Sequence, residues 1–256
     1  MSLYHPNDSK DNCGFGLIAH TKGEPSHKLV STAIEGLDRM QHRGGIAADG
    51  KTGDGCGLLL QTPDAFFRKI AEQQNWKLSK MFGVGVIFLN QDQALADLAK
   101  QVITEELEKE TLDVVGWRVV PTDNSVLGDL AASCVPQIEQ VFVNGPSGWR
   151  SQDLERRLFM ARRRAEKRLS NDEDFYIASL SSLVTIYKGL VMAGDLPQFY
   201  LDLADENMKS AICVFHQRFS TNTLPRWSLA QPFRYLAHNG EINTIRGNRD
   251  WAQART

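Results

Sequence analysis

Three groups of residues, far apart in the chain, carry side chains that can take part in the hydrolysis of an amide. Cys13 opens the run CGFG and supplies a thiol, which is a nucleophile once it is ionised. Arg218, in HQRFSTNT, has a guanidinium that can bind a carboxylate through two parallel hydrogen bonds. Asn239 and Gly240, in HNGEIN, can direct a side-chain amide and a backbone N–H at one point, as an oxyanion requires. Each group also has an ordinary interpretation: a buried thiol, a surface ion pair and a turn.

Cys13 differs from an ordinary cysteine because it follows a polar leader, residues 1–12, that has neither helical nor strand periodicity. If this leader were removed, Cys13 would carry a thiol and a free α-amine on the same residue. An α-amine titrates at about 7.7–8.0, so it can accept the thiol proton near neutral pH. The sequence therefore allows a nucleophile that is activated by its own amine.

The remaining cysteines and two histidines have less specific settings. Cys56, Cys134 and Cys213 are widely spaced and form no CxxC pair, which argues against a zinc site or a redox dithiol, so we expect packing residues. His216 and His238 could suggest a cysteine–histidine pair. Both follow apolar runs, where a structural histidine is the commoner case.

The composition indicates a soluble cytoplasmic protein that binds neither nucleic acid nor membrane. The chain has 256 residues, a net charge of -2 and no apolar run of transmembrane length. Its polar leader lacks the apolar core of a secretory signal. The basic run 156–168 carries one aromatic residue, Phe159, rather than a set of stacking residues, and it belongs to no recognised nucleic-acid-binding module, so we expect a helix with a solvated basic face.

Hydrophobic periodicity predicts alternating strands and helices without a domain boundary. The predicted strands are residues 13–20, 56–61, 82–89, 114–120, 137–143, 175–180, 183–189 and 210–218. The predicted helices are residues 29–40, a helix to about 74 with Thr62 as N-cap and Pro63 in its first turn, 93–110, the basic run and a segment from 243. This alternation favours a parallel α/β sheet, although periodicity alone does not distinguish it from antiparallel sheets covered by helices.

In their order along the chain, the motifs CGFG, QHRG, HQRFSTNT and HNGEIN resemble those of class II glutamine amidotransferases, which are N-terminal-nucleophile hydrolases. The longer runs MQHRGGIAADGKTGDGCGLLLQ and PFRYLAHNGEINTIRGN are similar to glutamate synthase large subunits over essentially the whole chain. The 205 residues between Cys13 and Arg218 fit the long insertion of that family. The resemblance implies an α+β fold, a four-layer αββα sandwich with largely antiparallel sheets, in place of the parallel sheet.

The resemblance also implies a role for each catalytic motif. Cys13 matches the nucleophile, and residues 1–12 match the propeptide that members of the family remove. Asn239 and Gly240 match the oxyanion hole. Arg43, in QHRG, matches a position near the nucleophile, where we expect a supporting role.

The expected glutamine pocket follows from the same resemblance. Arg218 matches the arginine that holds the α-carboxylate, and Phe219 and Thr221 continue along the pocket wall. Asp54, in GDGCG, belongs to the glutamate synthase pattern without an assigned role. The acidic residue that binds the α-amine lies in a Ser-Asp motif, and no such motif follows Gly240. We therefore expect residues 13–256 to be an amidotransferase domain truncated at its C-terminal end.

The implied activity is the hydrolysis of L-glutamine to glutamate and ammonia through a thioester. In the full enzyme, ammonia would pass to further domains of the same polypeptide, where 2-oxoglutarate is reductively converted to glutamate. Those domains imply FMN, a 3Fe-4S cluster, a reduced nicotinamide or ferredoxin donor and a small electron-transferring subunit, whereas no cofactor or metal is expected in this chain. Two alternatives are a hydrolase of other amides with the same fold and a non-catalytic docking domain.

Overall fold

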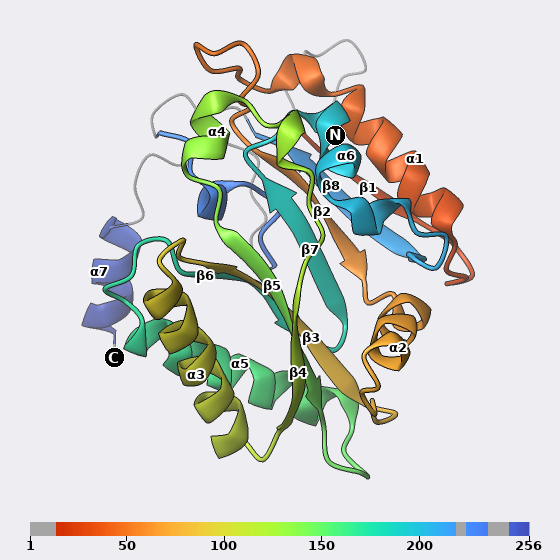
Figure 1. The fold of residues 1–256 in the computed structure, drawn as a ribbon, viewed down its shortest axis with the longest axis vertical. Helices are drawn as coiled ribbons and strands as arrows, with labels where there is room; N and C mark the ends of the chain where they lie inside the picture. Colours follow the sequence, from red (N-terminus) through yellow and green to blue (C-terminus); the bar gives the residue numbers. More distant parts are fainter. Residues whose placement is uncertain (1–13, 219–223, 235–245, 256) are drawn as a thin grey trace, which may run out of the picture.

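The computed structural model describes residues 14–218, 224–234 and 246–255 (Figure 1). In these residues the strands are β1 (Phe15–Ala19), β2 (Cys56–Gln61), β3 (Phe82–Leu89), β4 (Asp113–Val119), β5 (Gln137–Asn144), β6 (Tyr176–Ser181), β7 (Val184–Gly189) and β8 (Ile212–Gln217). The α-helices are α1 (His27–Asp38), α2 (Asp64–Gln73), α3 (Gln93–Lys109), α4 (Asp129–Ser133), α5 (Ser151–Arg168), α6 (Leu196–Phe199) and α7 (Arg246–Ala254).

The strands form two antiparallel sheets. The first has the order β1-β8-β2-β7 and the second the order β4-β5-β3-β6. All the pairings between the described strands of these sheets are antiparallel, including the β1–β8 pair, whose strands are separated by most of the chain. The antiparallel arrangement implied by the family resemblance is confirmed, and the parallel sheet favoured by the strand–helix alternation is wrong.

The second sheet is covered on both faces, which explains why all eight residues of β3 are buried. Val84, Val86 and Phe88 belong to the apolar core that includes residues of the first sheet. Ile87 and Leu89 belong to a separate core, together with apolar residues of α3 and α5. This period of two is that of a strand between two apolar layers.

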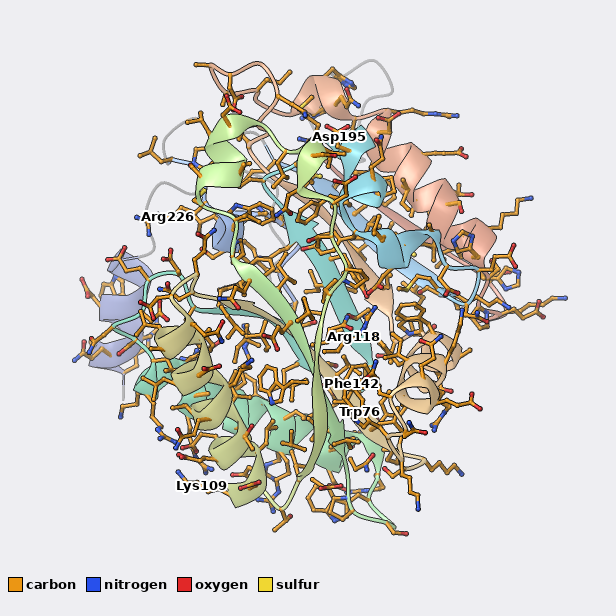
Figure 2. All side chains as sticks on the ribbon, viewed as in Figure 1. Trp76, Lys109, Arg118, Phe142, Asp195 and Arg226 are labelled. Atoms are coloured by element: carbon orange, nitrogen blue, oxygen red, sulfur yellow. The ribbon has the colours of Figure 1, made fainter. Side chains whose placement is uncertain are left out.

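The core between the sheets is rich in aromatic rings. Trp76 and Phe142 lie side by side in the lower half of the molecule, with ring centroids 5.2 Å apart (Figure 2). Phe67 meets Phe142 edge to face at 5.6 Å. Such tilted and edge-to-face pairs add to the free energy gained by burying the rings.

Helix α1 forms the fourth layer, over the first sheet. Its side chains Leu29, Val30, Ala33 and Leu37 are buried, and the Ser26 hydroxyl caps its first turn by accepting a hydrogen bond from the N–H of Leu29. An ideal Cβ on Gly36 would lie 2.9 Å from the Phe215 ring of β8, so glycine lets the helix approach the sheet closely. The layers therefore run α1, first sheet, second sheet, and α3 with α5.

The basic run forms α5, as predicted, and its arginines join the two outer helices by ion pairs. Arg157 and Arg164 both bind Glu110 at the end of α3, and Arg168 binds Glu106 at 2.8 Å. Both carboxylates are almost entirely buried, so the arginines also compensate for their desolvation.

Helix α2 begins one residue later than the sequence suggests. Pro63, rather than Thr62, is its N-cap, and no side chain caps the first turn. The Thr62 N–H instead donates to the Leu183 carbonyl at 2.9 Å, which holds this residue to the chain before β7. The expected threonine cap is therefore wrong. Among the described residues, no helix has both the length and the hydropathy to cross a bilayer.

Candidate active site

The start of β1 and the end of β8 meet at one end of the first sheet. The backbone N–H of Gln217 donates to the Gly14 carbonyl at 2.6 Å, continuing a ladder in which Phe15 faces His216. An ideal Cβ on Gly14 would lie 2.5 Å from the Gln217 carbonyl oxygen, so no larger residue fits there. The residue after Cys13 is therefore bonded to the residue before Arg218.

Arg218 lies against the loop that precedes β2. Its backbone N–H donates to the Gly55 carbonyl at 2.9 Å, and its Nη1 donates to the Asp54 carbonyl at 3.3 Å. Burial lowers the pKa of Arg218, and the nearby charge of Asp54 opposes that shift. Gly55 has a φ of +119°, a conformation that favours glycine. The GDGCG motif thus supplies the backbone acceptors that hold Arg218.

The QHRGG motif packs against the same residues through its two glycines. An ideal Cβ on Gly44 would lie 2.1 Å from Nε2 of Gln217, and one on Gly45 would lie 2.3 Å from Oδ2 of Asp54. The Gly45 carbonyl also accepts the N–H of Asp54 at 3.1 Å. A larger residue at either position would therefore displace the Gln217 or the Asp54 side chain.

Residues 46–52, between QHRGG and GDGCG, form a loop that is closed by the antiparallel bridge between Ile46 and Gly53. Asp49 holds the turn of this loop. The Asp49 carboxylate accepts hydrogen bonds from the Thr52 hydroxyl at 2.6 Å and the Thr52 N–H at 2.8 Å, and these hold its pKa well below the ordinary value. It also accepts the N–H of Leu130 in α4 at 3.1 Å. The sequence did not predict this contact between Asp49 and α4, although the Asp49-Gly50 pair in a polar stretch is a turn signal.

Arg43 lies at the end of the 3-10 turn Gln41–Arg43, and its side chain is exposed. Its Cβ would be 3.5 Å from a Cβ on Gly14, the residue next to Cys13. This places Arg43 beside the start of β1. Its supporting role remains a prediction.

The structure brings together Arg43, Asp54 and Arg218, which are separated by up to 175 residues of sequence. Cys13, Phe219, Thr221, Asn239 and Gly240 lie outside the described residues. His238 lies outside them too, whereas His216 is buried in β8.

Gln217 is a residue that the motif analysis missed. It is 3% exposed, and its Nε2 donates to the Arg218 carbonyl at 3.4 Å. Its position between two residues of the HQR motif was the only available signal.

The other cysteines divide into two groups. Cys56 and Cys213 are buried, as expected of packing residues, and the Cys56 thiol donates to the Val191 carbonyl at 3.3 Å. Cys134 is exposed at the end of α4, so the expectation that it packs in the core is wrong. Helix α4 has only five residues and leaves its last side chains at the surface.

The fold is an α+β sandwich of two antiparallel sheets with helices on the outside, and residues 13–256 match the family model of the class II glutamine amidotransferases. The chain belongs to this family. The match begins at Cys13.

Glutamate synthases are among its relatives. It is 43% identical to the glutamate synthase [NADPH] large chain of Bacillus subtilis over 100% of this chain and 17% of that protein. It is 42% identical to ferredoxin-dependent glutamate synthase 2 of Synechocystis over 97% of this chain and 16% of that protein. It is 44% identical to the chloroplastic/mitochondrial ferredoxin-dependent glutamate synthase 1 of Arabidopsis thaliana, over 95% of this chain and 15% of that protein. The chain thus spans about one sixth of the length of these relatives.

Proposed function

We propose that this chain is the glutamine-hydrolysing part of a glutamate synthase, with Cys13 as nucleophile. The observation that carries the proposal is the junction of Gly14, Gln217 and Arg218. It fastens the neighbour of the thiol to the strand end that bears the expected carboxylate-binding residue. Family membership and the intact motifs around it support the same assignment.

The proposed reaction begins after residues 1–12 have been removed. The Cys13 α-amine takes the thiol proton, and the thiolate attacks the side-chain carbonyl carbon of glutamine. Asn239 and Gly240 donate hydrogen bonds to the oxyanion that forms. The carbon–nitrogen bond then breaks, the protonated α-amine gives its proton to the leaving nitrogen, which departs as ammonia, and a γ-glutamyl thioester remains. Water hydrolyses this thioester, which releases glutamate and restores the thiol.

Arg218 supplies the recognition of glutamine in this proposal. Its backbone is held by Gly55 and one face of its guanidinium by the Asp54 carbonyl. A guanidinium fixed in this way loses little conformational freedom when it binds a carboxylate. Phe219 and Thr221, which follow it in the chain, are proposed to line the pocket, and Arg43 to support the nucleophile.

The cofactors of a glutamate synthase are proposed to lie in the rest of a longer polypeptide. Among the residues described for this chain, no group of three or more histidine, cysteine or acidic side chains could hold a metal. The three described cysteines are not clustered, so the donor set for a 3Fe-4S cluster does not fit these residues. FMN, the cluster, the NADPH or ferredoxin donor and a small electron-transferring subunit therefore belong to the proposal for the whole enzyme.

The test is a glutaminase assay on the full-length protein beside its Cys13→Ala variant, with intact mass measured for both. We expect the active protein to begin at Cys13 and the variant to release no ammonia from glutamine. Protein that retains residues 1–12 should be inactive, because its Cys13 nitrogen is an amide and cannot accept a proton. Full activity of the uncleaved protein would contradict the amine as base. Absence of glutamine hydrolysis in protein that begins at Cys13 would favour a docking domain or another amide substrate.

A further inference from the structure

A short stretch of chain links the two expected contact regions for glutamine. Residues 224–234, called here the bridging segment, follow the Arg218 motif and precede the Asn239–Gly240 pair. The segment includes the 3-10 turn Trp227–Leu229. What fixes the bridging segment therefore fixes the described chain that precedes the proposed oxyanion donors in the sequence.

Lys188, in β7, binds the backbone of the bridging segment through its side-chain amine. Its Nζ donates to the Ser228 carbonyl at 2.9 Å and to the Ala230 carbonyl at 2.7 Å. It also lies 3.2 Å from the Tyr176 hydroxyl, and it is 4.5 Å from the centroid of the Phe233 ring. The contacts of Lys188 with the Ser228 carbonyl, the Ala230 carbonyl and the Phe233 ring are thus all made with the bridging segment.

Lys188 is an unusual residue for this position. It is 0% exposed, and none of the described carboxylates forms an ion pair with it. Burial lowers its pKa well below the ordinary value. A buried amine is unfavourable unless its hydrogen bonds are made, so a Lys in place of an apolar residue indicates that these contacts matter. Removing it would leave two backbone carbonyls without their donor.

Three glycines let the bridging segment lie directly on the ends of β2 and β7. An ideal Cβ on Gly57 would be 2.8 Å from the Gln231 carbonyl oxygen. One on Gly189 would be 2.4 Å from the Trp227 ring, and one on Gly55 would be 2.9 Å from the Ala230 Cβ. The bridging segment is therefore seated beside the residues that hold Arg218.

Arg234 fastens the end of the bridging segment. It forms an ion pair with Glu155 of α5 and donates to the Leu180 carbonyl at 3.1 Å. Asn239 follows five residues later, which an extended chain spans in at most about 17 Å. Lys188 and Arg234 thus anchor the described chain immediately before the proposed oxyanion hole.

We infer that Lys188 is a positioning residue for glutamine hydrolysis, which fixes the bridging segment and, through it, the oxyanion donors Asn239 and Gly240. The inference rests on the proposed function. An oxyanion forms only after attack, so misplaced donors should lower kcat and leave glutamine binding almost unchanged. Arg218 keeps its own backbone acceptors without Lys188, so KM should not depend on this residue.

The test compares Lys188→Met with Tyr187→Phe in the full-length processed protein. Methionine has a similar length but no donor. Tyr187 is the buried neighbour of Lys188, and its hydroxyl binds Gln140 and Asp202 rather than the bridging segment. Tyr187→Phe therefore controls for the loss of buried hydrogen bonds in the same strand.

We expect Lys188→Met to lower kcat by about tenfold to a hundredfold with KM within about twofold, and Tyr187→Phe to leave both unchanged. Iodoacetamide should alkylate Cys13 of both variants at the wild-type rate, because the nucleophile itself is intact. If Lys188→Met does not fold, Arg234→Gln should show the same selective loss of kcat.

Wild-type kcat in Lys188→Met, or equal losses in Lys188→Met and Tyr187→Phe, would overturn the inference. A higher KM at unchanged kcat would overturn it as well. If Lys188→Met does not fold and Arg234→Gln is used in its place, a wild-type kcat in Arg234→Gln would overturn the inference. These results are distinct from failure of the proposed function, in which the wild-type protein and Cys13→Ala would behave alike towards glutamine.

Discussion

Gln217 donates its backbone N–H to the carbonyl of Gly14, across a 2.6 Å hydrogen bond that joins residues 203 positions apart. This bond holds the neighbour of the proposed nucleophile beside the neighbour of the proposed carboxylate-binding arginine. The two motifs therefore do not depend on loop conformation alone to meet, because the antiparallel ladder of β1 and β8 sets their register.

The oxyanion donors provide the first prediction. Asn239→Ala in the processed enzyme should lower kcat by about two to three orders of magnitude, the usual effect of removing one donor. The KM for glutamine should change much less, since the ground-state carbonyl gains little from this contact. Steady-state ammonia release measures both constants. An unchanged kcat would make Asn239 an ordinary turn residue.

The second prediction concerns Arg218. Arg218→Lys should raise the glutamine KM by at least about tenfold, because lysine cannot keep the two-pronged contact with a carboxylate. Labelling of Cys13 by a glutamine-like electrophile should slow, whereas labelling by iodoacetamide should not. Arg226→Lys is the matched control, since Arg226 is 61% exposed at the left of the molecule and its ion pair within the described part of the chain is with exposed Glu173 (Figure 2). Equal KM values for the two variants would remove Arg218 from the glutamine pocket.

The third prediction concerns the close approach of Gly45 to Asp54. In Gly45→Ala the new methyl group would lie 2.3 Å from the Asp54 carboxylate, so the Asp54 side chain must move, and we expect this movement to disturb the Asp54 carbonyl that binds Arg218. We expect the glutamine KM to rise by about threefold to tenfold with a smaller change in kcat.

Gly85→Ala is the control for overpacking, because its methyl group would meet the Val141 side chain of the neighbouring strand β5. Both variants should lose stability, by about 1–3 kcal/mol. Only Gly45→Ala should change KM, and a matching rise in Gly85→Ala would point to a general loss of folding instead.

The fourth prediction follows from the buried thiol of Cys213. Burial raises its pKa from 9.0 to about 12, so the folded protein retains a proton that the unfolded chain loses above pH 9. The stabilisation by the protonated thiol is complete below pH 9 and is lost as the pH rises towards 12.

Comparison with Cys213→Ala isolates this thiol, because the other groups titrate in both proteins. Between pH 8 and pH 10.5, the wild-type advantage in the free energy of unfolding should shrink by up to about 2 kcal/mol, since one pKa unit corresponds to about 1.4 kcal/mol. Urea denaturation at the two pH values measures this change. A constant difference would show that the thiol titrates alike in both states.

Local signals in the sequence predicted most elements. Strand 82–89 and strand 56–61 have the predicted bounds, because each is a continuous apolar run bounded by polar residues. The error at Thr62 arose because Pro63 itself takes the cap position and the Thr62 N–H is bonded to the Leu183 carbonyl, just before β7.

The sheet arrangement could not be derived from periodicity. Helices α3 and α5 lie on the same face of one sheet, so strand–helix alternation gave no information on strand direction. The β1–β8 pairing joins residues 15–19 to residues 212–216, which are about 200 positions apart in the sequence. The hydrophobic pattern of a short stretch of sequence carries no information on such a pairing. Family resemblance supplied the correct architecture instead.

The site was only partly accessible from motifs. Arg218 was predicted because a guanidinium suits a carboxylate, and Arg43 because it matches a position in the family pattern; both roles stay predictions. Lys188 was read only as part of a strand, since its importance comes from burial and from two carbonyls about forty residues away. Gln217 was missed for the same reason.

The first ladder residue of β1 is Phe15, two positions beyond Cys13. All the strand pairings described for the first sheet are therefore made by residues that proteolysis at Cys13 would leave in place. If residues 1–12 are removed as proposed, none of these described pairings has to be broken. Maturation would then act as a chemical trigger on an assembled scaffold, so that the timing of activity is set separately from the timing of folding.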